Sequence, residues 1–126
     1  MKKILLMAGL MLCLFFAACS KKGDATPTSH TIKFSATGSA GFTGVVSVLK
    51  TTSTVSTALD TKTVTVGQSY DYTTNLSVGD VVNFEMQTSG ENLLSYSITD
   101  NGTVVVQQSG KEVSSFSKIS AEYTVK

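Results

Sequence analysis

The 126-residue sequence contains no arginine and no tryptophan, and it has a single proline and a single histidine. Nucleic-acid-binding domains usually carry a basic surface in which arginine is prominent. The sequence has ten lysines and nine acidic residues, so its net charge of +1 is close to zero. These features argue against a nucleic-acid partner, and the lack of tryptophan counts modestly against carbohydrate binding.

Cysteine and histidine are too scarce to support the common catalytic and metal-binding chemistries. The two cysteines, Cys13 and Cys19, both lie near the N-terminus, so the rest of the chain has no disulfide, cysteine ligand or cysteine nucleophile. A serine nucleophile needs a nearby base, and the only histidine, His30, stands where we expect a solvated strand start. Most acidic residues fall in predicted turns or at outward strand positions. We therefore expect no catalytic residue, no metal site and no cofactor.

Only the N-terminus carries a long apolar run. Residues 1–3 include two lysines, residues 4–16 are apolar, and the next two are alanines, which is the layout of a secretory signal. The run is shorter than the roughly 20 apolar residues that span a bilayer. Two roles that this layout allows are an uncleaved N-terminal anchor and an ordinary signal peptide that contains a cysteine by chance.

Phe16-Ala17-Ala18-Cys19 resembles the lipobox of bacterial lipoproteins, in which two small residues precede a cysteine. The resemblance implies cleavage between Ala18 and Cys19 and attachment of diacylglycerol to the Cys19 thiol. Two or three acyl chains anchor a protein stably, whereas a single chain is marginal. We therefore predict a lipoprotein signal peptide at residues 1–18 and a membrane anchor at Cys19.

Residues 19–29 comprise the lipidated cysteine and a polar segment that we predict to be a flexible tether. By the reach of a flexible chain it spans less than about 20 Å, which keeps the domain near the membrane. Anchor and tether together resemble small lipoproteins of Bacteroidota, some of which carry a lysine and acidic export signal after the cysteine. Ser20 is compatible with sorting to the outer membrane of the cell envelope, whereas Lys22-Gly23-Asp24 lacks the consecutive acids of that export signal. The periplasmic and surface faces therefore both stay open.

From His30 onward, apolar and polar residues alternate with a period of two over most of the chain, which predicts half-buried strands. Asn101-Gly102 between two such runs predicts a tight hairpin, because both central residues of a type I′ turn need positive φ. Residues 109–112 are predicted to form another turn. We predict one all-β domain at residues 30–126, an antiparallel immunoglobulin-like β-sandwich of about seven to nine short strands. A small barrel is the alternative.

The predicted core consists of the apolar residues that share one face of these strands. They are Ile32, Phe34, Val46, Val48, Val64, Val66, Val82, Phe84, Met86, Leu94, Tyr96, Ile98, Val104, Val106, Ile119, Ala121, Tyr123 and Val125.

Four aromatic residues are candidates for a binding surface. Phe42 lies in a glycine-rich segment and Phe116 in a serine-rich one, and exposed loop aromatics can form a platform for a sugar or a peptide. Their alternative role is to close the ends of the sandwich. Tyr70 and Tyr72 share one face of a predicted strand, and they are candidates if that face is the outer one.

Residues 79–84 and 97–105 are similar to the small mycobacterial membrane protein family. Members of that family have an immunoglobulin-like β-sandwich outside the membrane and accompany lipid exporters of the resistance-nodulation-division type. This chain lacks the paired cysteines of the family and its helical anchor, so the resemblance bears on the fold more than on transport.

These observations predict a non-catalytic binding or accessory module that is anchored to a membrane of the bacterial envelope, with an envelope protein or a glycan as its partner. The alternative is a structural or assembly partner of an envelope export complex. An enzyme is the least supported function.

Overall fold

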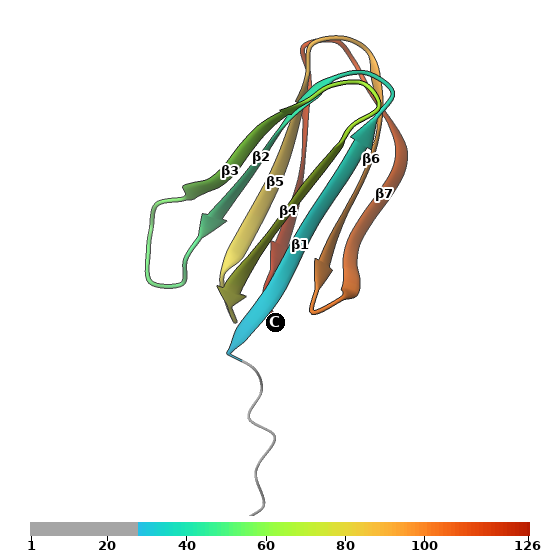
Figure 1. The fold of residues 1–126 in the computed structure, drawn as a ribbon. Coiled ribbons are helices and arrows are strands. Elements are labelled where there is room, and N and C mark those ends of the chain that lie inside the picture. The colour runs from blue at the N-terminus through green and yellow to red at the C-terminus, as the bar shows by residue number, and fades with distance from the viewer. Residues whose placement is uncertain (1–27) are drawn as a thin grey trace, which may run out of the picture.

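The computed structural model describes residues 28–126, which form eight β-strands in two layers (Figure 1). None of the residues in this range belongs to a helix of the length and apolarity that crossing a membrane requires. The predicted signal peptide, its cleavage site at Ala18 and Cys19, and nearly all of the predicted tether lie outside the described residues. The strands are β1 (Ser29–Gly38), β2 (Phe42–Leu49), β3 (Thr57–Val64), β4 (Ser69–Ser77), β5 (Val81–Thr88), β6 (Asn92–Asp100), β7 (Thr103–Val113) and β8 (Lys118–Thr124).

Two four-stranded sheets, ordered β4-β1-β6-β7 and β3-β2-β5-β8, face each other. All neighbouring strands within each sheet are antiparallel. The predicted antiparallel β-sandwich is therefore confirmed. The alternative prediction, a small barrel, is wrong because the strands form two separate sheets. Among the strands of residues 28–126, only β2–β3 and β6–β7 are hairpins between sequence neighbours, whereas every other connection crosses from one sheet to the other.

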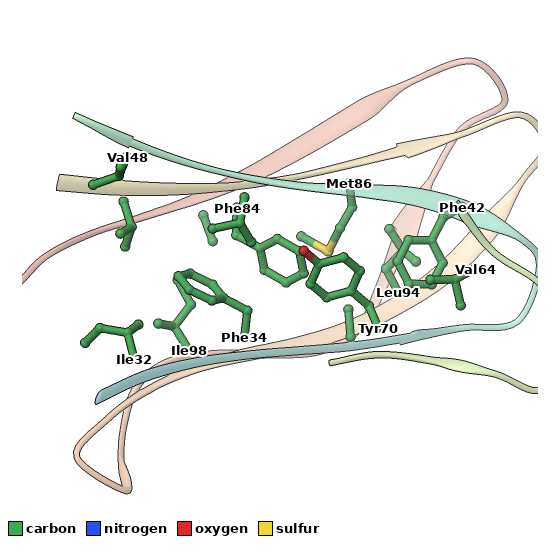
Figure 2. Close-up of a cluster of buried hydrophobic side chains, with 14 of the residues drawn as sticks. Ile32, Phe34, Phe42, Val48, Val64, Tyr70, Phe84, Met86, Leu94 and Ile98 are labelled. Atoms are coloured by element: carbon green, nitrogen blue, oxygen red, sulfur yellow. The ribbon is translucent and has the colours of Figure 1, made fainter. Parts of the chain in front are cut away.

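The core lies between the sheets and follows the alternation of the strands. Successive side chains of a strand point to opposite faces, so Ile32 and Phe34 of β1 are buried while their neighbours face solvent. The rings of Phe34 and Phe84 meet edge to face at a centroid distance of 5.6 Å. Tyr70 lies 5.0 Å from Phe84 on its other side, so three aromatic rings fill the middle of the sandwich (Figure 2).

Most of the predicted core is confirmed, but two of its members are wrong. Val66 is 68% exposed because it follows the end of β3, and Val104 is 52% exposed because it lies on the edge strand β7. Tyr96, Val106 and Ile119 are only partly buried against the core, as is Tyr123. The prediction missed buried Ala36, Phe42, Tyr70, Leu76 and Val113.

The predicted turn at residues 109–112 is also wrong, because β7 continues through it to Val113. Between the paired residues Leu94–Lys111 and Tyr96–Gln108, β7 holds one residue more than β6. Such an extra residue is a β-bulge, and Gly110 accommodates it with a φ of 59°. Gly110 therefore allows a bulge within a strand, and it does not form part of a chain reversal.

The chain runs up and down the sandwich, so its connections gather at two ends (Figure 1). We call the end at which β1 begins the tether end and the opposite one the distal end. The distal connections are residues 39–41, 65–68, 89–91 and 114–117, and those at the tether end are residues 50–56, 78–80 and 101–102.

Candidate functional site

An uncharged groove lies at the distal end of the sheet β3-β2-β5-β8. It is lined by residues 41–43, 63–66, 87–89 and Phe116, and we call it the distal groove. Its volume is about 440 Å³, which falls in the range of small-ligand sites, about 300–1,000 Å³. The lining comes from the ends of β2, β3 and β5, from the loop residues next to them and from the loop between β7 and β8. The site therefore exists only in the folded sandwich.

Phe116 is the most exposed large apolar side chain of the described residues, at 83%. It is the third residue of a turn at residues 114–117, which the amide of Ser117 closes by donating to the carbonyl of Ser114 over 3.3 Å. Its φ is 56°, in the left-handed region where a bulky residue is a genuine outlier. Such a conformation costs roughly 1–3 kcal/mol, and an exposed ring recovers little of it by burial. An outlier of this kind points to a functional role for the residue.

Thr88 holds the turn of Phe116 against the end of β5. Its backbone amide donates to the carbonyl of Ser117 over 3.0 Å. Its hydroxyl donates to the carbonyl of Ser114 over 2.9 Å, and the side chain is buried. Two hydrogen bonds from one buried residue therefore fix both ends of the turn beside the distal groove.

The polar side chains of the distal groove are hydroxyls and amides. Those of Thr43 and Thr63 bond to each other over 3.3 Å. Within the part of the chain that the structure describes, the side chains of Thr65, Gln87 and Ser89 make no hydrogen bond, and they line the groove around the aromatic ring. These groups both donate and accept hydrogen bonds, so they can pair with the hydroxyls or amides of a ligand.

The structure brings two of the four predicted surface aromatics together at this groove. Phe116 is exposed, as expected for a binding residue, whereas Phe42 begins β2 and is buried in the groove wall. Phe42 therefore closes the end of the sandwich, which was the alternative role considered for it. A loop position was predicted for Phe42, and strand β2 in fact begins there.

Tyr70 and Tyr72 are not surface residues, because the face of β4 that they share points inward. Tyr70 is fully buried in the core (Figure 2). Its hydroxyl donates to Oδ2 of Asp60 over 2.6 Å. Burial, and then the neighbouring Asp60, raise the pKa of Tyr70 far above its usual value. Tyr72 is half-buried and its ring stacks on Phe34 at 6.2 Å. The candidate surface role of Tyr70 is therefore wrong, and Tyr72 belongs to the margin of the core.

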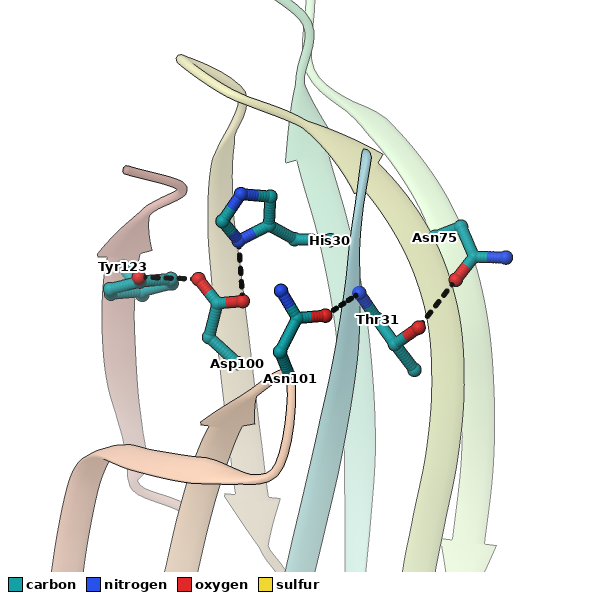
Figure 3. Close-up of polar contacts among 6 residues, drawn as sticks. All are labelled: His30, Thr31, Asn75, Asp100, Asn101 and Tyr123. Carbon is teal, nitrogen blue, oxygen red and sulfur yellow. Dashed lines mark hydrogen bonds and ion pairs between the residues drawn. The ribbon is translucent and has the colours of Figure 1, made fainter. Parts of the chain in front are cut away.

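A buried polar network at the tether end was not predicted (Figure 3). Nδ1 of His30 lies 2.6 Å from Oδ1 of Asp100, and the hydroxyl of Tyr123 donates to Oδ2 of the same carboxylate over 2.7 Å. His30 is only 8% exposed, so its expected solvation is wrong. Burial, and then the bond to Asp100, raise the pKa of Tyr123 to about 12. The network joins β1 and β6 of one sheet to β8 of the other.

The sequence does contain a signal for this network. His30 stands two residues before buried Ile32, and Asp100 stands two residues after buried Ile98. Because alternate residues of a strand share a face, the same alternation that identified the core placed both polar residues inward.

The hairpin of β6 and β7 docks on the start of β1. Asn101 and Gly102 have φ values of 47° and 84°, which confirms the predicted tight turn. The amide of Thr31 donates to Oδ1 of Asn101, and the amide of Asn101 donates to the carbonyl of Thr31, both over 2.9 Å. The hydroxyl of Thr31 donates to Asn75 of β4 (Figure 3). The first strand is thus held on both sides where the chain enters the domain.

A buried carboxylate, Asp80, organises the remaining loops of the tether end. It is 1% exposed and accepts hydrogen bonds from Nζ of Lys50 over 2.9 Å and from the amides of Thr51 and Ser77, each over 3.1 Å. Burial by itself raises the pKa of this carboxyl, but the bonds from Lys50 and the two amides outweigh it and lower the pKa. This arrangement ties the loop after β2 to the turn between β4 and β5.

The distal groove offers hydroxyls, an amide and an aromatic ring, which can hydrogen-bond to a ligand and stack on it. Among residues 28–126, no group of three or more His, Cys, Asp or Glu side chains is placed to hold a metal ion. No protein-family model, curated protein or solved structure matches this chain. Its function is therefore inferred from the geometry above and from the N-terminal sequence.

Proposed function

We propose that this protein is a membrane-anchored lipoprotein of the bacterial envelope whose β-sandwich is a non-catalytic binding module. The observation that carries the proposal is the position of the distal groove. It lies at the opposite end of the sandwich from Ser29, where β1 begins. An anchor that precedes β1 is therefore attached at the opposite end of the domain from the groove and Phe116, so the attachment leaves that surface open to a partner.

The lipobox supports the anchor, and the outer membrane is the proposed destination. Only nine residues separate Cys19 from Ser29 in the sequence, so the domain stays close to the membrane. A partner of the distal groove is then held at the membrane by a short connection. This arrangement suits an accessory protein that concentrates a glycan or an envelope protein at the membrane.

The anchor is tested by replacing Cys19 with alanine in the full chain. Labelled palmitate and membrane fractionation are followed in the wild type, in Cys19→Ala and in Cys13→Ala. We expect loss of label and of membrane association only in Cys19→Ala, because Cys13 leaves with the signal peptide. If palmitate labelling and membrane association both persist in Cys19→Ala, the lipoprotein proposal is wrong.

The binding role is tested with the lipidated full chain purified in detergent and incubated with solubilised envelope. The variants are Phe116→Ser at the groove and Val55→Ser, which removes a side chain that is 69% exposed at the tether end. We expect retention of envelope protein or glycan by the wild type and by Val55→Ser, and its loss in Phe116→Ser. Equal retention by all three proteins overturns the role of the groove. If the wild type retains subunits of an export complex and Phe116→Ser retains them equally well, the result supports the alternative, an assembly role.

A further inference from the structure

We infer that the distal groove binds an uncharged sugar residue of a glycan, with the ring of Phe116 as the platform on which the sugar stacks. This inference rests on the proposed binding function and names the chemistry of the partner. Three features of the groove carry it: the absence of charge in its lining, the hydroxyl and amide groups around the ring, and the small extent of its exposed apolar surface.

Within the described part of the chain, none of the side chains that line the distal groove is charged. A phosphate, a nucleotide or an acidic sugar is normally held by a cation. The lysine nearest to Phe116 in the sequence, Lys118, is paired with Glu85 over 3.1 Å. Lys62, next to the groove residue Thr63, donates to the carbonyl of Ser69 over 3.2 Å. The groove therefore matches a neutral ligand.

Neutral sugars present hydroxyl groups around an apolar C–H face. Thr65, Gln87 and Ser89 supply hydroxyls and an amide with no hydrogen-bond partner in the described part of the chain. These side chains can donate to and accept from sugar hydroxyls. Phe116 and the exposed Val66 supply the apolar surface for the C–H face. The two kinds of surface lie in one groove, as a sugar requires.

A protein partner fits the distal groove less well. A stable protein interface covers about 800 Å² on each partner and has an apolar centre rich in aromatic side chains. Here Val66 and Phe116 are the only large apolar side chains of the groove that are strongly exposed. A second copy of this chain meets the same objection, so a small polar ligand is favoured.

The turn that carries the aromatic platform is also held in place before any ligand arrives. The two hydrogen bonds from Thr88 fix the turn that carries Phe116. A surface that is already ordered loses less conformational freedom on binding. Phe116 has its positive φ within this turn, and its ring lines the groove.

The inference is tested with the lipidated full chain in detergent, against soluble neutral glycans (dextran, mannan and xylan) and acidic ones (polygalacturonate and alginate). Dissociation constants are measured by affinity electrophoresis and calorimetry. We expect binding to at least one neutral glycan and to no acidic one. Phe116→Ala should weaken that binding about tenfold or more, as for a central binding residue. Phe116→Tyr should preserve it, and Val55→Ala should leave it unchanged.

Each contrary outcome has a distinct meaning. The sugar inference is overturned if no neutral glycan binds or if only acidic glycans bind. It is also overturned if a neutral glycan binds and Phe116→Ala does not weaken that binding. If Phe116→Ser still loses a protein partner from the solubilised envelope, the proposed binding function stands without the sugar. Sedimentation tests for self-association. If the wild type self-associates and Phe116→Ala does not, the groove binds a second copy of the chain, and the sugar inference is overturned.

Discussion

His30 and Asp100 contact each other through Nδ1 and Oδ1 at 2.6 Å, although 70 positions separate them in the sequence. The contact lies at the tether end, where the chain enters the domain. Because Tyr123 bonds the other oxygen of the same carboxylate, the pair also reaches across to the opposite sheet. The network therefore stabilises the sandwich against separation of its two layers at this end.

The hydroxyl of Tyr123 should make the stability of the protein sensitive to alkali. Its pKa is raised from 10.0 to about 12 in the folded protein, so its contribution is complete below pH 10 and is lost as the pH rises toward 12. Tyrosinate absorbance should show a late step near pH 12, and Tyr123→Phe should abolish it. Tyr96→Phe, which removes a hydroxyl without a hydrogen bond in the described region, should leave the step in place. A late step that survives in Tyr123→Phe contradicts this assignment.

Gly44 is required because the ring of Tyr70 occupies the space of a side chain. A Cβ at Gly44 would lie 2.6 Å from Cδ2 of Tyr70, closer than van der Waals contact allows. We expect Gly44→Ala to lower the free energy of unfolding by about 1–3 kcal/mol, as overpacking does. Gly90→Ala is the matched control, since a Cβ there meets nothing within 4 Å. Urea denaturation of both variants measures the difference, and equal stability of the two contradicts the packing argument.

Asp80 should make an acid-sensitive contribution to stability. Its pKa is lowered in the folded protein, so the contribution is complete above the ordinary value of 3.8 and is lost as the pH falls through the lower folded pKa. Asp80→Ala should cost about 2–4 kcal/mol at neutral pH, because two amides and Lys50 lose their acceptor. Denaturation at pH 7 and at pH 3 should show a smaller acid effect in Asp80→Ala than in the wild type. Glu91→Ala, at an exposed distal position, should behave as the wild type does.

Replacing Phe116 with glycine should make the protein more stable and abolish binding. Glycine adopts the φ of 56° without strain, so Phe116→Gly should raise the free energy of unfolding by about 1 kcal/mol. Phe116→Ala keeps a Cβ in the strained conformation and should show no comparable gain. Chemical denaturation of the three proteins measures the effect. A loss of stability in Phe116→Gly would show that the ring has a structural role.

The inner strands were predictable because each has one buried face. In β5, buried Val82, Phe84 and Met86 alternate with side chains of the outer face, and period-two patterns report such faces directly. The hairpin at Asn101-Gly102 was predictable because its turn has a specific sequence requirement. Gly110 could not be assigned in the same way, since glycine serves bulges as well as turns.

The candidate site was predictable only in part. Phe116 was identified from its serine-rich surroundings, but the distal groove depends on the convergence of residues 63–66, 87–89 and 116, which the strand order alone decides. Tyr70 was misplaced for a related reason. Its strand alternates tyrosine with polar residues, and only the packing of the second sheet shows which face is inner.

The strand order also governs how this domain acquires its structure. β1 pairs with β4 and β6, so the first strand completes its hydrogen bonding only when residues near Asp100 are in place. β5 likewise needs β8, near the end of the chain. Sheets built from such distant segments must close long loops before pairing stabilises them. They fold in about milliseconds to seconds, whereas domains of local contacts fold in about microseconds to milliseconds. Both sheets are therefore complete only when residues as far along the chain as β8 are available for pairing.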